Sequence, residues 1–174
     1  TPGKPMVFHG NNGVSKKGKE AHQFSNYYSW TRLKGNGKLS GVTSDIVFEN
    51  ASVWMDREIF DNYVNESQQG WDWFAIQLDN NTEFMVFRVR GKTREADYFG
   101  GTFVDKDGQS ISLNSNDIVM SPLKTWTSPK SGNTYPLKWE IKIPRFDHNL
   151  IIDARVSNQE LLSKYPLPIT YWEG

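Results

Sequence analysis

The stretch Trp71-Asp72-Trp73-Phe74-Ala75-Ile76-Gln77-Leu78 is followed, after Asp79-Asn80-Asn81, by Thr82-Glu83-Phe84-Met85-Val86-Phe87-Arg88-Val89-Arg90. Two extended runs on either side of a short Asn-rich turn predict a long β-hairpin. Side chains alternate along a strand, so Trp71, Trp73 and Gln77 share one face. Phe74 and Ile76 lie on the other. Both faces are largely apolar and one carries two tryptophans and an amide, which predicts a β-protein with an aromatic pocket.

The rest of the chain shows short extended segments between turn signals. These segments are expected at 25–33, 38–41, 43–49, 51–58, 98–105, 109–113, 135–143 and 149–156. Only 158–164 has a helical pattern, with Ser157 or Asn158 as its N-cap. This spacing predicts an all-β fold, an antiparallel barrel or sandwich of roughly eight strands with one short helix. We expect residues 1–24 to form a polar loop or linker and residues 25–174 to form one β-domain.

The composition argues against several classes of partner. Lys and Arg together count 20, as do Asp and Glu, so the net charge is zero, and the sequence has no basic stripe. This argues against nucleic acid and anionic membranes as main partners. No apolar run reaches the roughly 18 residues that a membrane-spanning helix needs. Cysteine is absent, which excludes disulfides and thiol catalysis and leaves the compartment open. The chain starts without an initiator Met, so we expect a processed or trimmed product.

No cofactor and no metal site are predicted. His9, His22 and His148 are scattered and lack the spacing of metal ligands. The run Gly10-Asn11-Asn12-Gly13 is not followed by the Lys-Ser/Thr of a phosphate-binding loop. No Gly-x-Ser-x-Gly elbow occurs among the serines, so the residues indicate no hydrolase chemistry.

Asp56 and Glu58 are the candidate catalytic residues. Together with Trp54 they project to one side of an extended segment. Two carboxylates near an apolar wall cannot both ionise easily, so one would keep its proton at neutral pH. Hydration of an isolated alkene needs such an acid, an electron-rich aromatic face and a positioned water. The alternative is that both carboxylates end a strand, accept backbone N–H groups or pair with surface arginines.

The candidate ligand-binding residues are mostly aromatic. They are Tyr28, Trp54, Trp71, Trp73, Gln77 and Trp172. Gln77 could hydrogen-bond a polar group of an apolar ligand, or it could bond the backbone of a neighbouring strand. Trp54 shares a face with Asp56, and Trp71 shares one with Trp73. These two faces meet in one cavity only if the strand registers bring them together.

Six phrases occur in order along the chain and carry a family resemblance. They are Tyr27-Tyr28-Ser29-Trp30-Thr31-Arg32-Leu33, Trp54-Met55-Asp56-Arg57-Glu58, the run from Gly70 to Asp79, Gly101-Thr102-Phe103-Val104-Asp105, the segment from Trp126 to Tyr135-Pro136, and Tyr171-Trp172-Glu173-Gly174. In combination they resemble the lipocalin-like AttH/carotenoid 1,2-hydratase (hydroxyneurosporene synthase) family. Lipocalin-like Diels–Alderases and kievitone hydratase belong to the same broad group.

The resemblance implies two tandem lipocalin-like β-domains, of which this chain is similar to the second. Relatives continue beyond Tyr171-Trp172, so we expect the C-terminal edge to be open and paired with a second lipocalin-like domain or another chain. The family often has His between the Asp and Glu of its Met-Asp-x-Glu element. Arg57 stands there in this chain, which puts a mechanism that needs that imidazole in doubt. Resemblance alone favours a periplasmic or secreted location.

Three functions stay open. The favoured one, by analogy with lipocalin barrels, is binding of a lipophilic small molecule in an aromatic-lined cavity. The first alternative is a cofactor-free, acid-catalysed hydratase or cyclase for an unsaturated terpenoid or polyketide, with Asp56 as proton donor. The second is a carbohydrate-binding β-sandwich, whose tryptophans would form an exposed platform. A deep apolar cavity would favour the first two, and buried carboxylates would favour catalysis.

Overall fold

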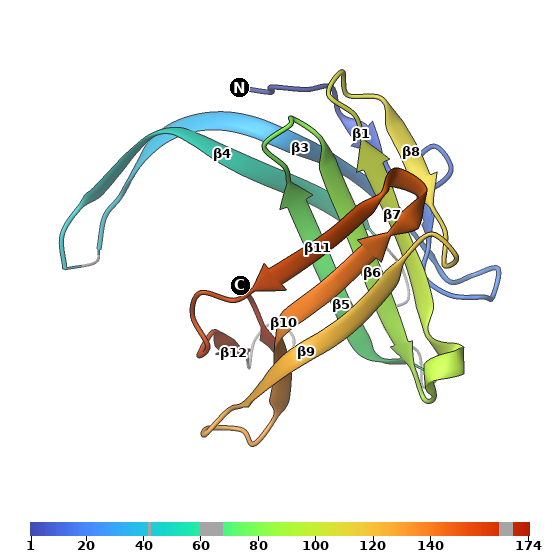
Figure 1. Cartoon of the computed structure of the whole chain (residues 1–174). Coiled ribbons are helices and arrows are strands. Elements are labelled where there is room, and N and C mark those ends of the chain that lie inside the picture. The colour runs from blue at the N-terminus through green and yellow to red at the C-terminus, as the bar shows by residue number, and fades with distance from the viewer. Residues whose placement is uncertain (42, 60–67, 164–168) are drawn as a thin grey trace. The chain divides into compact units, whose positions relative to one another are not determined.

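The computed structural model describes residues 1–41, 43–59, 68–163 and 169–174, which form antiparallel β-strands joined by turns (Figure 1). By its internal packing the chain divides into two compact units, Thr1–Ser115 and Asn116–Gly174. The predicted all-β, antiparallel fold is confirmed. The described residues contain strands β1 to β13, more than the roughly eight expected. Several of the additional strands have only two or three residues, too few to show an alternating pattern in the sequence.

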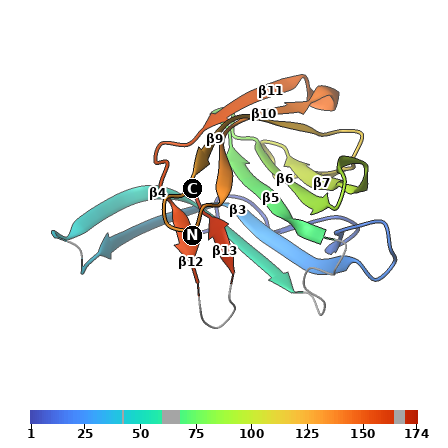
Figure 2. The same cartoon turned by 90° about the horizontal axis from the view of Figure 1, so that it is seen from below.

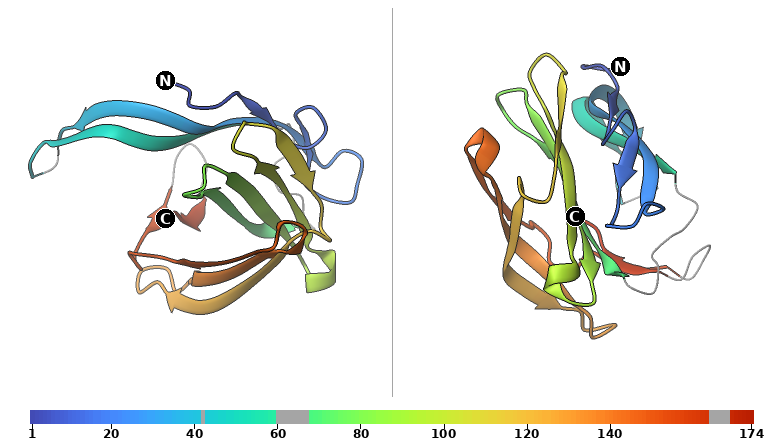
Figure 3. Two further views of the ribbon diagram at one scale, coloured as in Figure 1. Left: turned by 45° about the horizontal axis from the view of Figure 1, so that its top comes forward. Right: turned by 90° about the vertical axis from the view of Figure 1, so that its right-hand side faces the viewer.

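The N-terminal unit contains two four-stranded sheets. The first consists of β1 (Val7–Phe8), β2 (Val14–Lys16), β3 (Phe24–Leu39) and β4 (Ile46–Ile59); β1, β2 and β4 all pair with β3. The second has the order β5 (Gln68–Gln77), β6 (Glu83–Gly91), β7 (Tyr98–Val104) and β8 (Ser110–Leu113), with a 3₁₀ turn at Arg94–Ala96. Figure 3 shows these two sheets lying one over the other.

The central hairpin is formed as predicted. β5 and β6 pair antiparallel with Trp73 opposite Phe87. The turn closes with a backbone hydrogen bond from Leu78 to Thr82 of 2.9 Å, and Asn81 takes a left-handed φ of 63°. Asparagine tolerates that conformation better than most residues, which explains the Asn-rich turn.

A hydrophobic core lies between the two sheets of the N-terminal unit. Tyr27, Met85 and Phe87 form its buried centre, and Trp54, Val89 and Tyr98 pack against it. Gly100 of β7 is opposite Phe87, and a Cβ atom at position 100 would lie 2.6 Å from Cζ of that ring. Glycine is therefore required there, because any side chain would displace the phenylalanine.

The ribbon of β3 and β4 is longer than the sequence suggested. The extended segments expected at 25–33 and 38–41 merge into β3, and those at 43–49 and 51–58 merge into β4. The regular pairing of β3 with β4 is interrupted by register shifts between Trp30 and Leu33 and between Gly35 and Gly37. The two strands stay paired on either side of each shift. The outer half of the ribbon extends beyond the rest of the N-terminal unit (Figure 2). Its exposed apolar side chains are Leu39, Ile46, Val47 and Phe48.

The first 24 residues are not a loop throughout. Phe8 of β1 pairs with Tyr28, and Val14 of β2 pairs with Asn26, so both strands add to the edge of β3. Each strand is too short to be recognised by alternation, and only its hydrogen bonds to β3 define it.

The C-terminal unit is built on the sheet β11-β10-β9. These strands span Val119–Thr127 (β9), Thr134–Ile143 (β10) and His148–Asp153 (β11), with a 3₁₀ turn at Pro144–Phe146. The alternation predicted for 135–143 is confirmed, since Leu137, Trp139, Ile141 and Ile143 are buried. Of the residues that the structure covers, none belongs to a helix long and apolar enough to cross a membrane.

The predicted helix over 158–164 is wrong. Residues Glu160–Leu162 form β12 and pair with β13, Thr170–Trp172; Lys164 lies outside the described residues. A helix of seven residues is weakly stable by itself, so strand pairing with Thr170–Trp172 outweighs its local preference. Glu160 also accepts hydrogen bonds from the hydroxyls of Ser128, Ser131 and Tyr135. These contacts hold it against the β9–β10 hairpin.

Candidate functional site

The pairing of β3 with β4 places Asp56 and Glu58 on the inner face of their sheet. Asp56 lies opposite Ser29 and Glu58 opposite Tyr27. Directly opposed residues of antiparallel strands share a face, so all four side chains point the same way. Neither carboxylate is buried: Asp56 is exposed, and the Glu58 side chain is 29% exposed. Buried carboxylates, which would have favoured catalysis, are therefore not found at these positions.

A hydrogen-bonded hydroxyl joins Trp73 to Asp56. The Tyr27 hydroxyl donates to Oδ1 of Asp56 at 2.8 Å and accepts the indole N–H of Trp73 at 3.1 Å. Burial, reinforced by the charge of Asp56, raises the pKa of Tyr27 far above its ordinary value. The tyrosine therefore stays protonated and donates to the carboxylate. Strand register thus brings the Trp73 face and the Asp56 face together.

A second set of contacts surrounds Oδ1 of Asp56. The hydroxyl of Ser29 also donates to this oxygen. Behind Ser29 lies His9, whose Nε2 is 2.7 Å from the serine oxygen and whose Nδ1 is 2.8 Å from the hydroxyl of Thr102. His9, Ser29 and Thr102 are each at most 1% exposed. The exposed carboxylate therefore rests on a buried polar support that reaches the second sheet.

Glu58 is engaged by a different group. Its Oε1 forms an ion pair with Lys17 at 2.8 Å and accepts the hydroxyl of Ser25 at 2.6 Å. The ammonium of Lys17 also lies over the rings of Phe87 and Tyr27, 3.9 and 4.9 Å from their centroids. Burial lowers the pKa of Lys17, and Glu58 partly opposes this effect. Glu58 thus compensates the charge of the half-buried Lys17. This resembles the non-catalytic role that the sequence left open, pairing with a cation, except that the cation is a lysine and not an arginine.

The tryptophans of the predicted site differ in exposure. Trp71 and Trp73 are 39% and 37% exposed. Trp54 packs against the core formed by Tyr27 and Phe87, and its buried indole N–H has no hydrogen-bond partner among the described residues. The first two can meet a ligand, whereas Trp54 mainly supports the ring of Tyr27.

Gln77 takes the backbone role that the sequence left open. Its amide donates to the carbonyl of Thr31 at 2.7 Å and accepts the hydroxyl of Ser52 at 2.7 Å. Both partners belong to the first sheet, so Gln77 joins the two sheets across their interface.

Tyr28 does not lie next to Asp56. Adjacent residues of a strand point to opposite faces, and Tyr28 packs with Phe8 and Trp30 on the outer face of β3, at centroid distances of 6.2 Å. Tyr27 occupies the expected place instead. Trp172 belongs to the C-terminal unit, where its indole donates to the carbonyl of Ser157 at 2.8 Å.

Sequence reasoning missed most of the residues behind Asp56. Ser29 lies two residues after Tyr27, so the two side chains share a face of β3. The pairing of β3 with β4 would have been needed to place Ser29 opposite Asp56. His9 gave no local signal, because a single histidine beside a two-residue strand has no recognisable spacing. Lys17 stood in a segment expected to be a loop.

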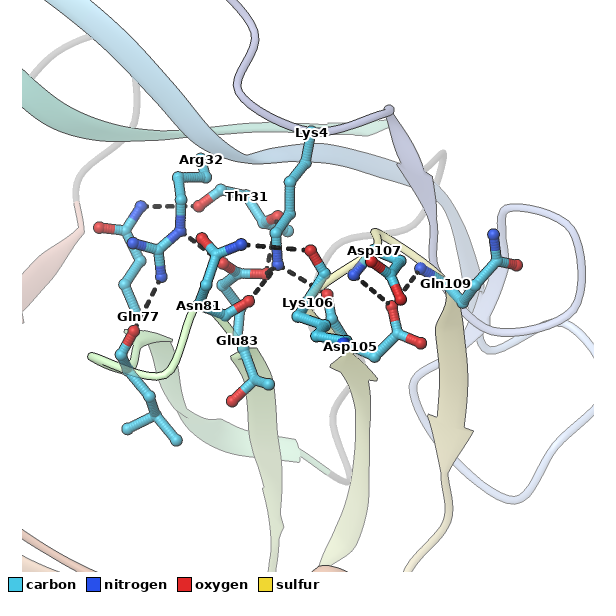
Figure 4. Close-up of polar contacts among 12 residues, drawn as sticks. Lys4, Thr31, Arg32, Gln77, Asn81, Glu83, Asp105, Lys106, Asp107 and Gln109 are labelled. Carbon is cyan, nitrogen blue, oxygen red and sulfur yellow. Dashed lines mark hydrogen bonds and ion pairs between the residues drawn. The ribbon is translucent and has the colours of Figure 1, made fainter.

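A second polar cluster is buried next to the β5–β6 turn (Figure 4). Glu83 is fully buried and pairs with Lys4 at 2.8 Å and with Arg32 at 2.6 Å. The Lys4 ammonium also donates to the carbonyls of Asn81 and Asp105. All three protons of Lys4 and both oxygens of Glu83 are used, so this cluster holds turns together and offers no group to a ligand.

The described parts of the chain contain no group of three or more His, Asp or Glu residues that could hold a metal ion. What the site offers is one exposed carboxylate, held by two buried hydroxyls, and indole surface. Such a set can bind an apolar molecule with a polar end, or exchange a proton with it.

This chain is similar in sequence and in fold to known proteins. The sequence matches the AttH-like family over residues 1–174. A solved structure from Nitrosomonas europaea, assigned to AttH, is 29% identical with a TM-score of 0.89, covering 100% of this chain and 53% of that chain. Kievitone hydratase from Nectria haematococca is 20% identical with a TM-score of 0.76, covering 96% of this chain and 50% of that chain.

The chain therefore spans about half the length of each of these two proteins. No curated protein sequence gives a significant match. The likeness to kievitone hydratase concerns the fold, and with the first structure it confirms a lipocalin-like all-β architecture. Because the family match extends over the whole sequence, this chain belongs to the AttH-like family.

Proposed function

We propose that this chain binds a lipophilic small molecule in an aromatic-lined cavity around Trp73 and Asp56. The observation that carries the proposal is that the partly exposed indole of Trp73 donates to the Tyr27 hydroxyl that holds Asp56. Trp71, also partly exposed, lies on the same face of β5 as Trp73. Covering apolar surface is worth about 25 cal/mol per Å², so an apolar ligand on these rings would be stabilised. The carboxylate would orient a polar end of the same ligand.

The alternative function is acid-catalysed hydration or cyclisation of an unsaturated molecule. In hydration Asp56 would give its proton to one alkene carbon, and water would add to the resulting carbocation and return a proton to Asp56. Trp73 and Tyr27 would supply the electron-rich faces that stabilise the cation. A neighbour of the same fold is named a hydratase, which favours this alternative over other chemistries. Glu58 has its own cation and is not needed in this scheme.

The proposal includes a macromolecular partner, a second lipocalin-like domain or another chain, at the C-terminal edge formed by β13 (Thr170–Trp172). The outer β3–β4 ribbon is a second surface for such a partner. The outer β3–β4 ribbon exposes Leu39, Val47 and Phe48, of which Val47 is 68% exposed. A two-stranded ribbon is only marginally stable in water, and an exposed apolar patch of this kind marks an interaction surface. The two solved neighbours are about twice as long as this chain, which leaves room for such a domain.

The test of ligand binding is a tryptophan-fluorescence titration. Long-chain polyenes and fatty acids are compared with soluble sugars. A saturable change with the lipophiles, reduced in Trp73→Ala, is the expected result. Binding of sugars without any lipophile would favour the carbohydrate-binding alternative. Mass spectrometry of an unsaturated ligand after incubation separates the two lipophilic functions, because catalysis adds one water or changes the ring count.

A further inference from the structure

A chain of buried side chains leads to Asp56 from the second sheet. Thr102 of β7 contacts Nδ1 of His9 at 2.8 Å, and Nε2 of the same ring contacts Ser29 at 2.7 Å. The Ser29 hydroxyl then bonds to Oδ1 of Asp56. The ring of His9 also packs on Tyr27, with centroids 4.2 Å apart. His9 therefore contacts both residues whose hydroxyls hold Asp56, Ser29 by a hydrogen bond and Tyr27 by ring packing.

The number of protons determines the direction of every bond in this chain. The Ser29 hydroxyl donates its single proton to Oδ1 of Asp56, so the serine oxygen accepts from Nε2 of His9. A neutral imidazole carries one N–H, so Nδ1 accepts the hydroxyl of Thr102. Burial, reinforced by the positive charge of Lys17, lowers the pKa of His9 to about 3. The ring is therefore neutral and protonated on Nε2.

The two oxygens of Asp56 have different surroundings. Oδ1 accepts from both Tyr27 and Ser29. Among the residues that the structure describes, no donor contacts Oδ2. Because the residue is exposed, Oδ2 is the oxygen that an incoming molecule can reach.

We infer that His9 and Ser29 are positioning residues that hold Asp56 with Oδ2 directed to the ligand, and that the ligand is a lipophilic alcohol whose hydroxyl donates to Oδ2. The inference rests on the proposed function for the existence of a lipophilic ligand. An acceptor selects a donor: an ether of the same shape has no proton to give, and a carboxylate is repelled by the charge of Asp56. The indoles of Trp71 and Trp73 would bind the apolar chain of all three compounds alike.

The histidine tautomer is tested without any ligand, by ¹⁵N NMR of the ring nitrogens in the complete chain. His22→Gln and His148→Gln assign the three histidine signals. We expect His9 to be neutral at pH 7 with its proton on Nε2, and Ser29→Ala to change the signal of that nitrogen. The control Ser15→Ala, a buried serine outside this chain of contacts, leaves it unchanged. A proton on Nδ1, or on both nitrogens, would overturn the positioning role.

The ligand class is tested by calorimetric titration with 1-decanol, decyl methyl ether and decanoate. A hydrogen bond to a charged group predicts that the alcohol binds at least about tenfold more tightly than the ether. The preference should fall to less than about threefold in Ser29→Ala and return in Ser29→Thr, with circular dichroism verifying that both variants fold. Equal binding of all three compounds overturns the ligand class and leaves the proposed function standing. If none of the three compounds binds, both the ligand class and the proposed function are overturned. The NMR experiment then decides separately whether His9 and Ser29 position Asp56.

Discussion

Trp73 of β5 donates its indole hydrogen bond to the hydroxyl of Tyr27 on β3, with a distance of 3.1 Å between nitrogen and oxygen. The bond crosses from one sheet of the N-terminal unit to the other. It fixes an indole that is 37% exposed beside the hydroxyl that holds Asp56. A change in either residue should therefore affect both the geometry of the site and its apolar surface.

Replacing Trp73 separates these two contributions. Trp73→Ala removes the ring and should weaken the binding of a lipophile by about 2–4 kcal/mol, through lost burial and stacking. Trp73→Phe keeps an aromatic ring and removes only the bond to Tyr27, so a loss of about 1 kcal/mol is expected. Isothermal titration calorimetry measures both. Trp30→Ala, a change at an indole that packs on Tyr28 on the outer face of β3, is the control and should not alter the affinity. Equal affinities for Trp73→Ala and the wild type would contradict the assignment.

Asp56→Asn tests the carboxylate. The substitution keeps the size of the side chain but removes the charge, and Nδ2–H would meet a donor if it replaced Oδ1. We expect loss of hydration or cyclisation activity if the chain is catalytic, measured by product formation in mass spectrometry. Asp79→Asn in the exposed β5–β6 turn is the matched control. Glu160 is unsuitable as a control, because it accepts three hydroxyl hydrogen bonds and holds β12.

The buried histidine makes stability depend on pH. Burial, and secondly Lys17, lowers the pKa of His9 from 6.5 to about 3. Between these values the unfolded chain binds a proton that the folded chain does not, so the free energy of unfolding falls as the pH falls. The slope from this residue reaches about 1.4 kcal/mol per pH unit. Urea denaturation across this range should show a smaller slope for His9→Gln, and the exposed His22→Gln should follow the wild type.

The ion pair of Lys4 with Glu83 should be important for stability. Their side chains are 3% and 0% exposed, so Lys4→Met would leave a buried carboxylate with only part of its compensation. The expected loss is about 3–5 kcal/mol in the free energy of unfolding. Lys38→Met is the control, because it removes an ion pair with Asp45 whose two side chains are 55% and 50% exposed. It should lower the free energy of unfolding by less than about 1 kcal/mol. Similar losses for the two variants in chemical denaturation would argue against a special role for the buried pair.

Local pattern was a good guide where a strand is long and alternates. The hairpin of β5 and β6 and the strand β10 follow directly from period-two alternation and an Asn-rich turn. The same reasoning placed Asp56 and Glu58 on one face. It failed for Glu160–Leu162, where pairing with Thr170–Trp172 decides the conformation of a segment whose local preference is weak.

Register and long-range contacts decided the site itself. Nothing local to His9 indicates that it contacts Ser29, 20 residues away, or Thr102, 93 residues away. Whether Tyr27 or Tyr28 faces Asp56 depends on which alternate side chains of β3 point inward. Only the pairing of β3 with β4 and the packing of the second sheet determine this. The amino-acid sequence by itself determined the all-β class, the central hairpin and the shared face of Asp56 and Glu58. Tertiary structure decided which groups surround Asp56, because hydrogen bonds between sheets depend on distances that no local pattern encodes.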